Sequence, residues 1–318
     1  MSPLANYGWA TYGWGSGVTD EGLRAADQLW RDLMGRSDEP TIIFVHIPRT
    51  AGTTLNRILG RTYPQQRTYA FPTTDIEGSV VAFRSLPAEE RRRFRLLRGH
   101  ITFGIHDAVP RPFTYITLLR DPVDRLVSTY SYILEKPEHR LHERLCSTGM
   151  RFEDFVRSGI TLETDNWQTR AISGVRQNFG CCSEAMLSQA KQNIVDCFSV
   201  CGITERFDET LVLLRRALAW EWRSLYHTPE NATRLRPRRI DVPRPWVEAV
   251  EHQNPLDLEL YAFARRRLER SFGEDAELRR ESEHLRQRNA RYEPILDAWM
   301  RTRILKNRVL ARSRGHTR

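Results

Sequence analysis

Lysine and cysteine are both scarce in this sequence. Three lysines stand among 49 lysines and arginines in 318 residues, so nearly every positive charge belongs to arginine. The five cysteines are odd in number, two of them adjacent (Cys181 and Cys182), and no histidine or second cysteine pair completes a zinc pattern. We therefore expect reduced thiols and no metal, as is typical of a cytoplasmic protein.

Long apolar runs are also lacking. No stretch of about 18 apolar residues occurs, which excludes a conventional membrane-spanning helix. The first residues contain no basic segment followed by an apolar one, so we expect no signal peptide and a cytoplasmic location.

Acidic residues are absent after Asp297, although the whole chain carries a formal charge of +9. A basic excess favours an anionic partner such as a nucleotide, a glycan or a nucleic acid. The plainer interpretation of the basic end is a solvated helix terminus.

The rest of the composition indicates a folded protein, with 40% hydrophobic residues and eight tryptophans. We expect three parts: an N-terminal arm (1–39), a catalytic domain (40–272) and a basic helical extension (273–318). Pro- and Arg-rich residues 226–245 are expected to form a long loop.

Alternating strand and helix patterns predict an α/β fold. The apolar run 41–46 reads as a buried parallel strand. Further strands are expected at 95–98, 115–119 and 198–203, and helices at 122–135, 183–196, 207–219 and 256–271. We predict a P-loop-like three-layer fold with a central parallel sheet flanked by helices, and a ligand at the carboxyl ends of the strands.

The segment HIPRTAGTT (46–54) follows the first expected strand and leads into a helix. It does not match the Walker A pattern. It nevertheless offers Gly52 for close backbone approach, the hydroxyl groups of Thr53 and Thr54, the cation of Arg49, and N–H groups at a helix N terminus, which together suit an anion. The alternative is an ordinary strand-to-helix turn capped by threonine.

A second anion site is indicated by LLRDPVDRLVSTYSY (118–132). Arg120 ends a strand, Pro122 suits the first turn of a helix, and Ser128 lies about two turns further on, so Arg120 and Ser128 can converge. The alternative is a helical Asp121–Arg125 pair, with Arg120 in a surface salt bridge.

Between these segments, RGHITFG (98–104) places His100 just after an expected strand. A histidine there is a candidate general base, because its ordinary pKa lies near neutral pH. The alternative is a hydrogen-bonded structural histidine. We expect His46 to brace the first loop, and His106 is the next candidate for the base.

The segment DNWQTR (165–170) supplies three polar residues, Asn166, Gln168 and Arg170. They are candidates for lining the acceptor or cofactor cleft. The alternative, equally supported, is a polar network that holds a turn.

These segments together resemble the glycan-type sulfotransferases, the family that includes the heparan sulfate 2-O- and 6-O-sulfotransferases. HIPRTAGTTL resembles the family signature HIPKTGGTSL, and RDPVDRLVSTY resembles RDPVxRxxSxY. GH at 99–100, DNWQTR, GITERF (202–207) and the pattern at 254–268 resemble further family elements. The resemblance covers about residues 41–270, and the arginine-rich composition favours a bacterial member.

The resemblance implies a division of roles. The donor would be 3′-phosphoadenosine 5′-phosphosulfate (PAPS), and the spent donor 3′-phosphoadenosine 5′-phosphate (PAP). Arg120 and Ser128 would bind the 3′-phosphate, and His100 would be the base, with Arg49 as a second catalytic residue. The 5′-phosphosulfate would be held by Arg49, Thr50, Ala51, Gly52, Thr53 and Thr54. Arg49 and Ala51 depart from the signature, which has Lys and Gly there.

We therefore predict a sulfotransferase that moves a sulfuryl group from PAPS to a hydroxyl group, on a sugar or glycan, by in-line displacement. Residues 136–151 and 234–239 are expected to face the acceptor, and their basic content favours an acidic one. Two alternatives remain: a nucleotide-dependent kinase, and a non-catalytic binder of polyanions or nucleic acid. We expect no nucleic-acid partner, and homo-oligomerisation is left open.

Overall fold

Parallel strands form the centre of the protein. The computed structural model describes residues 40–227 and 241–291. Its sheet has the order β2-β3-β1-β4-β5, and every pairing is parallel. The strands are β1 (Thr41–Val45), β2 (Thr68–Phe71), β3 (Leu96–Gly99), β4 (Phe113–Leu119) and β5 (Phe198–Ile203).

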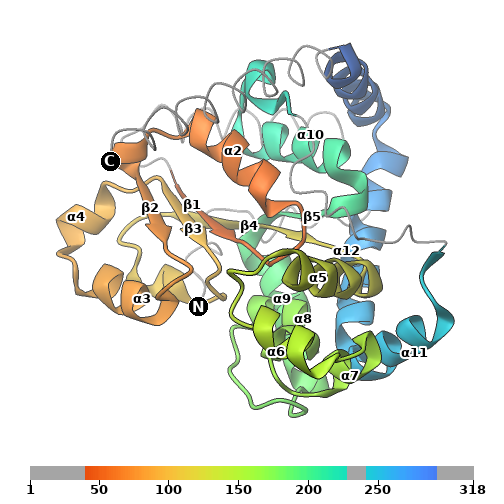
Figure 1. Ribbon diagram of the computed structural model, residues 1–318. Coiled ribbons are helices and arrows are strands. Elements are labelled where there is room, and N and C mark those ends of the chain that lie inside the picture. Colours follow the sequence, from red (N-terminus) through yellow and green to blue (C-terminus); the bar gives the residue numbers. More distant parts are fainter. Residues whose placement is uncertain (1–39, 228–240, 292–318) are drawn as a thin grey trace, which may run out of the picture.

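Helices cover both faces of this sheet, which confirms the predicted α/β fold. Figure 1 shows α2 and α10 on one side of the strands and α8 and α9 on the other. The helices are α2 (Gly52–Thr62), α3 (Ile76–Ser85), α4 (Ala88–Arg92), α5 (Pro122–Glu135), α6 (His142–Thr148), α7 (Phe152–Arg157), α8 (Trp167–Ser173), α9 (Glu184–Cys197), α10 (Phe207–Leu218), α11 (Arg244–Gln253) and α12 (Pro255–Glu274). Single 3₁₀ turns are η2 (Gln65–Arg67), η3 (Ile105–Ala108), η4 (Leu162–Thr164), η5 (Thr204–Arg206) and η6 (Trp222–Leu225).

The buried core surrounds the central strands. All five residues of β1 are buried, as expected for an apolar strand between two layers of helices. β2 lies at the edge of the sheet with a single buried residue, Phe71, and no strand was predicted there. The four predicted strands and the helices α5, α9, α10 and α12 lie within a few residues of the expected positions.

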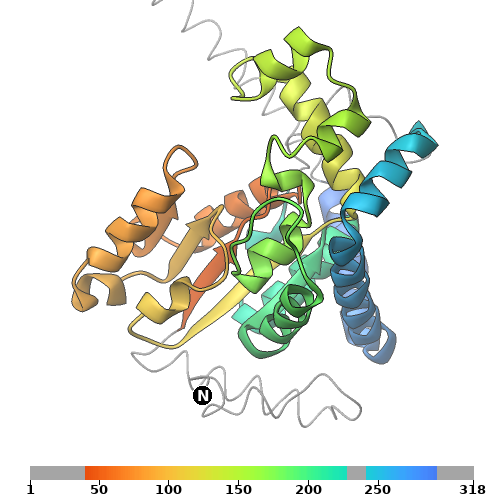
Figure 2. The ribbon, with the colours of Figure 1, turned by 90° about the horizontal axis from the view of Figure 1, so that it is seen from below.

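A second apolar cluster lies beside the sheet. It joins α5, α6, α7 and α11, and includes Leu126, Leu145, Phe155 and Val250. Figure 2 shows these helices gathered at one end of the molecule, away from α3 and α4. The cluster therefore packs against α5, the helix that carries Ser128.

The two ends of the chain were expected to be separate parts. The arm (1–39), much of the expected loop (228–240) and the basic end (292–318) lie outside the described residues. Residues 276–291 are helical, and Leu278 and Leu285 are buried in the main core. The boundary at residue 272 stays a prediction.

Within the described ranges, none of the helices combines the length and the apolar character needed to cross a membrane. The five cysteines are all free.

We expect Phe155→Ala to destabilise the second cluster, because the Phe155 side chain is fully buried. The free energy of unfolding should fall by about 3–5 kcal/mol, measured by urea denaturation. Val81→Ala is the control, because Val81 is 63% exposed. An equal, small effect in both variants would contradict this packing.

Candidate active site

The loop between β1 and α2 has an unusual backbone. Arg49 (φ 65°) and Ala51 (φ 61°) both adopt left-handed conformations, although neither is glycine. Such conformations cost free energy and concentrate at functional sites. Because this loop ends on the N terminus of α2, its N–H groups suit an anion.

Gly52, the first residue of α2, is required by a close approach. A Cβ atom at this position would lie 2.0 Å from Cδ2 of the His46 ring. The His46 ring thus packs directly on the start of the helix. This contact does not test ligand binding. It explains why a residue without a side chain stands at this position.

The three threonines of the loop have different environments. The Thr50 hydroxyl is buried and donates to the Ile47 carbonyl (2.8 Å), so it shapes the loop. Thr54 is buried on α2, whereas Thr53 is exposed on its first turn. The predicted roles of Thr53 and Thr54 in anion binding stay predictions.

The second predicted site forms where β4 passes into α5. Asp121 caps α5 by accepting a hydrogen bond from the Asp124 N–H (3.1 Å). Arg120 and Ser128 are both buried, at 7% and 2% exposure. The alternative of an Asp121–Arg125 pair with a surface Arg120 is therefore not what the structure shows.

The two sites meet. Arg49 Nε donates to the Ser128 hydroxyl (3.1 Å), and Arg120 Nη1 donates to the Arg49 carbonyl (2.8 Å). The Arg49 guanidinium also lies 4.5 Å from the centre of the Tyr132 ring, a cation–π contact. Because β1 and β4 are parallel neighbours, their carboxyl ends bring together residues 71 positions apart.

His100 stands beside the first loop, after β3. Its Nδ1 lies 2.7 Å from the His46 carbonyl oxygen. A carbonyl can only accept, so Nδ1 must carry the proton and Nε2 keeps its lone pair. The His46 and His100 rings are stacked, with centroids 4.2 Å apart.

Both of these rings are held in the neutral form. Burial lowers the pKa of His46 to about 3, assisted by the neighbouring His100. Burial also lowers the pKa of His100, against the opposing effects of the His46 carbonyl and of Glu163. A neutral His100 with a free Nε2 lone pair has the form that a general base needs at pH 7.

His106, the second candidate for the base, has another role. The Tyr115 hydroxyl accepts from the N–H groups of Gly104 and His106, and it lies 2.9 Å from His106 Nδ1. His106 Nδ1 is thus committed to Tyr115, which is part of the core.

Comparison with known proteins decides the family. The model of the galactose-3-O-sulfotransferase family matches residues 7–298. The chain belongs to this family. The resemblance to glycan-type sulfotransferases is thereby confirmed, and the matched residues include both predicted anion sites.

The individual proteins that this chain resembles are also sulfotransferases. Galactose-3-O-sulfotransferase 3 of cattle is 27% identical over 244 residues, which cover 73% of this chain and 57% of the relative. The mouse protein of the same name is 28% identical over the same span. Heparan sulfate 2-O-sulfotransferase 1 of chicken is 23% identical over 256 residues, covering 73% and 71%. The chain thus spans little more than half of the galactose-3-O-sulfotransferases that it matches.

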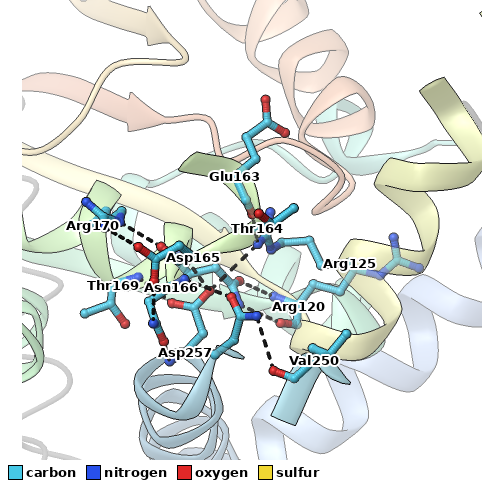
Figure 3. A network of polar contacts seen from close by, with 12 residues as sticks. Arg120, Arg125, Glu163, Thr164, Asp165, Asn166, Thr169, Arg170, Val250 and Asp257 are labelled. Atoms are coloured by element: carbon cyan, nitrogen blue, oxygen red, sulfur yellow. Dashed lines mark hydrogen bonds and ion pairs between the residues drawn. The ribbon is translucent and has the colours of Figure 1, made fainter. Parts of the chain in front are cut away.

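In this family member, the DNWQTR segment forms a buried network (Figure 3). Asn166, Gln168 and Arg170 are at most 4% exposed. Arg170 pairs with Asp165, and Asn166 accepts from the N–H groups of Leu256 and Asp257. The geometry favours the alternative of a network that holds a turn.

Gln168 links this network to Arg120, which belongs to the second predicted anion site. Its side-chain oxygen accepts from the Arg120 N–H, and its amide donates to the Arg120 carbonyl, both at 2.9 Å. Glu205 supports the same turn by accepting from the Asp121 N–H (3.2 Å). Contact of Asn166, Gln168 or Arg170 with the acceptor stays a prediction.

Arg125 was missed as a key residue. It is fully buried, donates to the Glu163 carbonyl (2.7 Å) and lies 3.9 Å from a carboxylate oxygen of Asp257. That carboxylate also accepts from the N–H groups of Gln168 and Thr169. The signal was its position on the apolar side of α5, between Val123 and the pair Leu126 and Val127.

Among the described residues, no three His, Cys, Asp or Glu side chains are grouped as a metal site would require.

We expect Gly52→Ala to weaken binding of PAP by about tenfold or more, because the new methyl group displaces the His46 ring or the loop. Gly60→Ala is the matched control on the same helix. Its Cβ would meet only Arg98 Nη1, at 3.6 Å, and should stabilise α2 by about 0.5–1 kcal/mol. Titration calorimetry measures the PAP affinity of both variants. Equal affinities would contradict the assignment of the loop to donor binding.

Proposed function

We propose that this chain is a sulfotransferase that transfers the sulfuryl group of PAPS to a hydroxyl group of a carbohydrate. The observation that carries the proposal is the meeting of the two anion sites beside His100, through Arg49, Ser128 and Arg120. Membership of the galactose-3-O-sulfotransferase family supports it. The names of the relatives, which refer to galactose and heparan sulfate, support a sugar acceptor.

The site fits the charges of the donor. The N terminus of α2, with the left-handed loop before it and Gly52 at its start, offers N–H groups to a 5′-phosphosulfate. Arg120 and Ser128 would hold the 3′-phosphate, the group that distinguishes PAPS from ATP. When bound, PAPS supplies an activated sulfuryl group on its 5′-phosphate.

Arg49 has a position that fits both phosphate sites. Its backbone belongs to the first loop, while its guanidinium contacts Ser128 and Tyr132 of the second. An arginine can hold two oxygen atoms at once, so it can replace the lysine of the family signature as a cation. We propose that it stabilises negative charge at the 5′ end of the donor.

His100 would remove the proton of the acceptor hydroxyl. Its Nδ1–H is anchored on the His46 carbonyl, so the ring cannot turn without breaking that hydrogen bond. Nε2 can then accept the hydroxyl proton, leaving the oxygen able to attack in line. The positive charge that develops on the ring is opposed by burial and favoured by Glu163.

We also propose a reducing, cytoplasmic setting for the chain, which the five free cysteines support. The experiment is the thiol content of protein purified without reductant. Five titratable thiols after unfolding are expected, whereas a disulfide would overturn the proposal.

Nucleotide preference tests the two phosphate sites. We expect PAP to bind more tightly than AMP, which lacks only the 3′-phosphate, and more tightly than ADP or ATP. Ser128→Ala should weaken PAP by about 1–3 kcal/mol and leave AMP unchanged, because Ser128 is assigned to the 3′-phosphate. Calorimetry would measure this, and a preference for ATP would favour the kinase alternative.

The pH profile and His100→Ala test the base. A base acts when unprotonated, so kcat/KM should rise with pH through the pKa of His100 and be level above it. Because burial lowers this pKa below the ordinary 6.5, the acid limb should lie below pH 6.5.

Replacement of His100 by alanine should lower kcat by about 10²–10⁴-fold while PAP affinity is retained. A fully active His100→Ala enzyme would show that another group takes the proton.

A further inference from the structure

Asn56 has no role in the proposed mechanism, although it lies on α2 just after the proposed donor loop. Its side-chain nitrogen Nδ2 lies 3.1 Å from Nδ1 of His46. Its backbone carbonyl accepts a hydrogen bond from Arg98 Nη1 (2.9 Å), on β3. Asn56 therefore joins α2 both to the residue that follows β1 and to the neighbouring strand.

The contact with Asn56 fixes the place of the proton on the His46 ring. An amide nitrogen can only donate, so His46 Nδ1 must accept and keeps its lone pair. In a neutral ring the proton then lies on Nε2. Burial keeps the ring neutral by lowering the pKa of His46 to about 3, assisted by His100. Nε2–H is therefore the one donor group that the ring offers near neutral pH.

The edge of the ring that carries Nε2 lies against the start of α2. A Cβ atom at Gly52 would stand 2.2 Å from His46 Nε2, so no side chain could fit between the ring and the helix. Gly52 is the first residue of α2, and the first N–H groups of a helix have no partners within the helix. The His46 N–H thus lies next to the backbone donors that we assign to the 5′-phosphosulfate.

The other groups of the ring are occupied. Nδ1 accepts from Asn56, and the ring stacks on those of Phe44 and His100, with centroids 5.3 and 4.2 Å away. Within residues 40–227 and 241–291, Nε2 has no hydrogen-bond partner. A half-buried N–H without a partner costs free energy unless a ligand accepts its hydrogen bond. An anion held by the loop would be such an acceptor.

We propose that His46 donates from Nε2–H to the 5′-phosphate of the donor, and that Asn56 is the positioning residue that keeps the proton on this nitrogen. The inference rests on the proposed function and deepens it, because it adds a neutral side-chain donor to the backbone N–H groups and to Arg49. Neutrality matters beside the proposed base. A positive charge on His46 would be stacked on His100 and would oppose the uptake of a proton there.

Two nucleotides that differ only in the 5′-phosphate test the donor role of His46. PAP carries this group, and adenosine 3′-phosphate lacks it. With the full chain, His46→Phe keeps a ring over Gly52 and removes the N–H, so we expect it to weaken PAP binding by about tenfold, measured by titration calorimetry. The affinity for adenosine 3′-phosphate should be unchanged, which also reports that the variant is folded. His46→Gln retains an amide N–H donor and should recover most of the affinity for PAP.

Nuclear magnetic resonance tests the position of the proton. In the full chain labelled with ¹⁵N-histidine, long-range ¹H–¹⁵N correlation spectra distinguish rings protonated at Nδ1 from rings protonated at Nε2. The signals that are lost in His46→Phe identify His46. We expect the Nε2–H form alone in the wild type, with the Nε2 signal shifting when PAP is added. Asn56→Leu is similar in size but has no donor, so it should make the Nδ1–H form detectable and weaken PAP binding.

The outcomes separate this inference from the proposed function. An Nδ1–H form in the wild type, or equal PAP affinities of the wild type and His46→Phe, would overturn the role of His46. An equal loss for both nucleotides would do the same, since the ring would then only shape the loop. An unchanged proton position in Asn56→Leu would overturn the role of Asn56. Each of these results would leave the sulfotransferase proposal standing, whereas a wild-type chain that binds no PAP would overturn the proposed function and this inference with it.

Discussion

A buried positive charge organises the candidate active site. The Arg125 guanidinium is out of reach of water and joins three segments that are distant in the sequence: α5, η4 and α12. Removing one partner from a buried charge pair commonly costs about 3–5 kcal/mol, because the other charge is left uncompensated. The arrangement is therefore held by the need to satisfy this charge as much as by apolar packing.

The effect of that charge reaches the anion site in steps. Asp257, the acidic neighbour of Arg125, receives the first N–H groups of α8. This contact fixes the N terminus of α8. Gln168, in the first turn of α8, forms hydrogen bonds with both the N–H and the carbonyl of Arg120. Gln168, one of the residues expected to line the acceptor or cofactor cleft, thus holds the backbone of Arg120, the residue that we propose to bind a phosphate. Such support often decides how well a binding site is formed.

The architecture could be predicted because its signals are local. β1 is a continuous apolar run, and the two anion motifs follow strands that are parallel neighbours, so their meeting could be anticipated. β2 gave no such signal, since it is a short edge strand with one buried residue. The base could be placed for the same reason as the motifs, by its position just after a strand.

The buried polar network could not be foreseen. Asn166 is paired with residues 88 to 91 positions away, and the sequence around DNWQTR reads equally well as a surface or an interior. Burial of polar groups depends on partners, and partners are set by tertiary structure. The same limit applies to Arg125, whose partners on η4 and α12 are distant in the sequence.

His46 contacts two parts of the candidate active site. Its ring packs over Gly52, at the start of α2, and its carbonyl accepts from the proposed base. The start of α2 and the proposed base are thereby tied to the same residue. A displacement of His46 would therefore move the start of α2 and the proposed base together, so the two cannot change position independently.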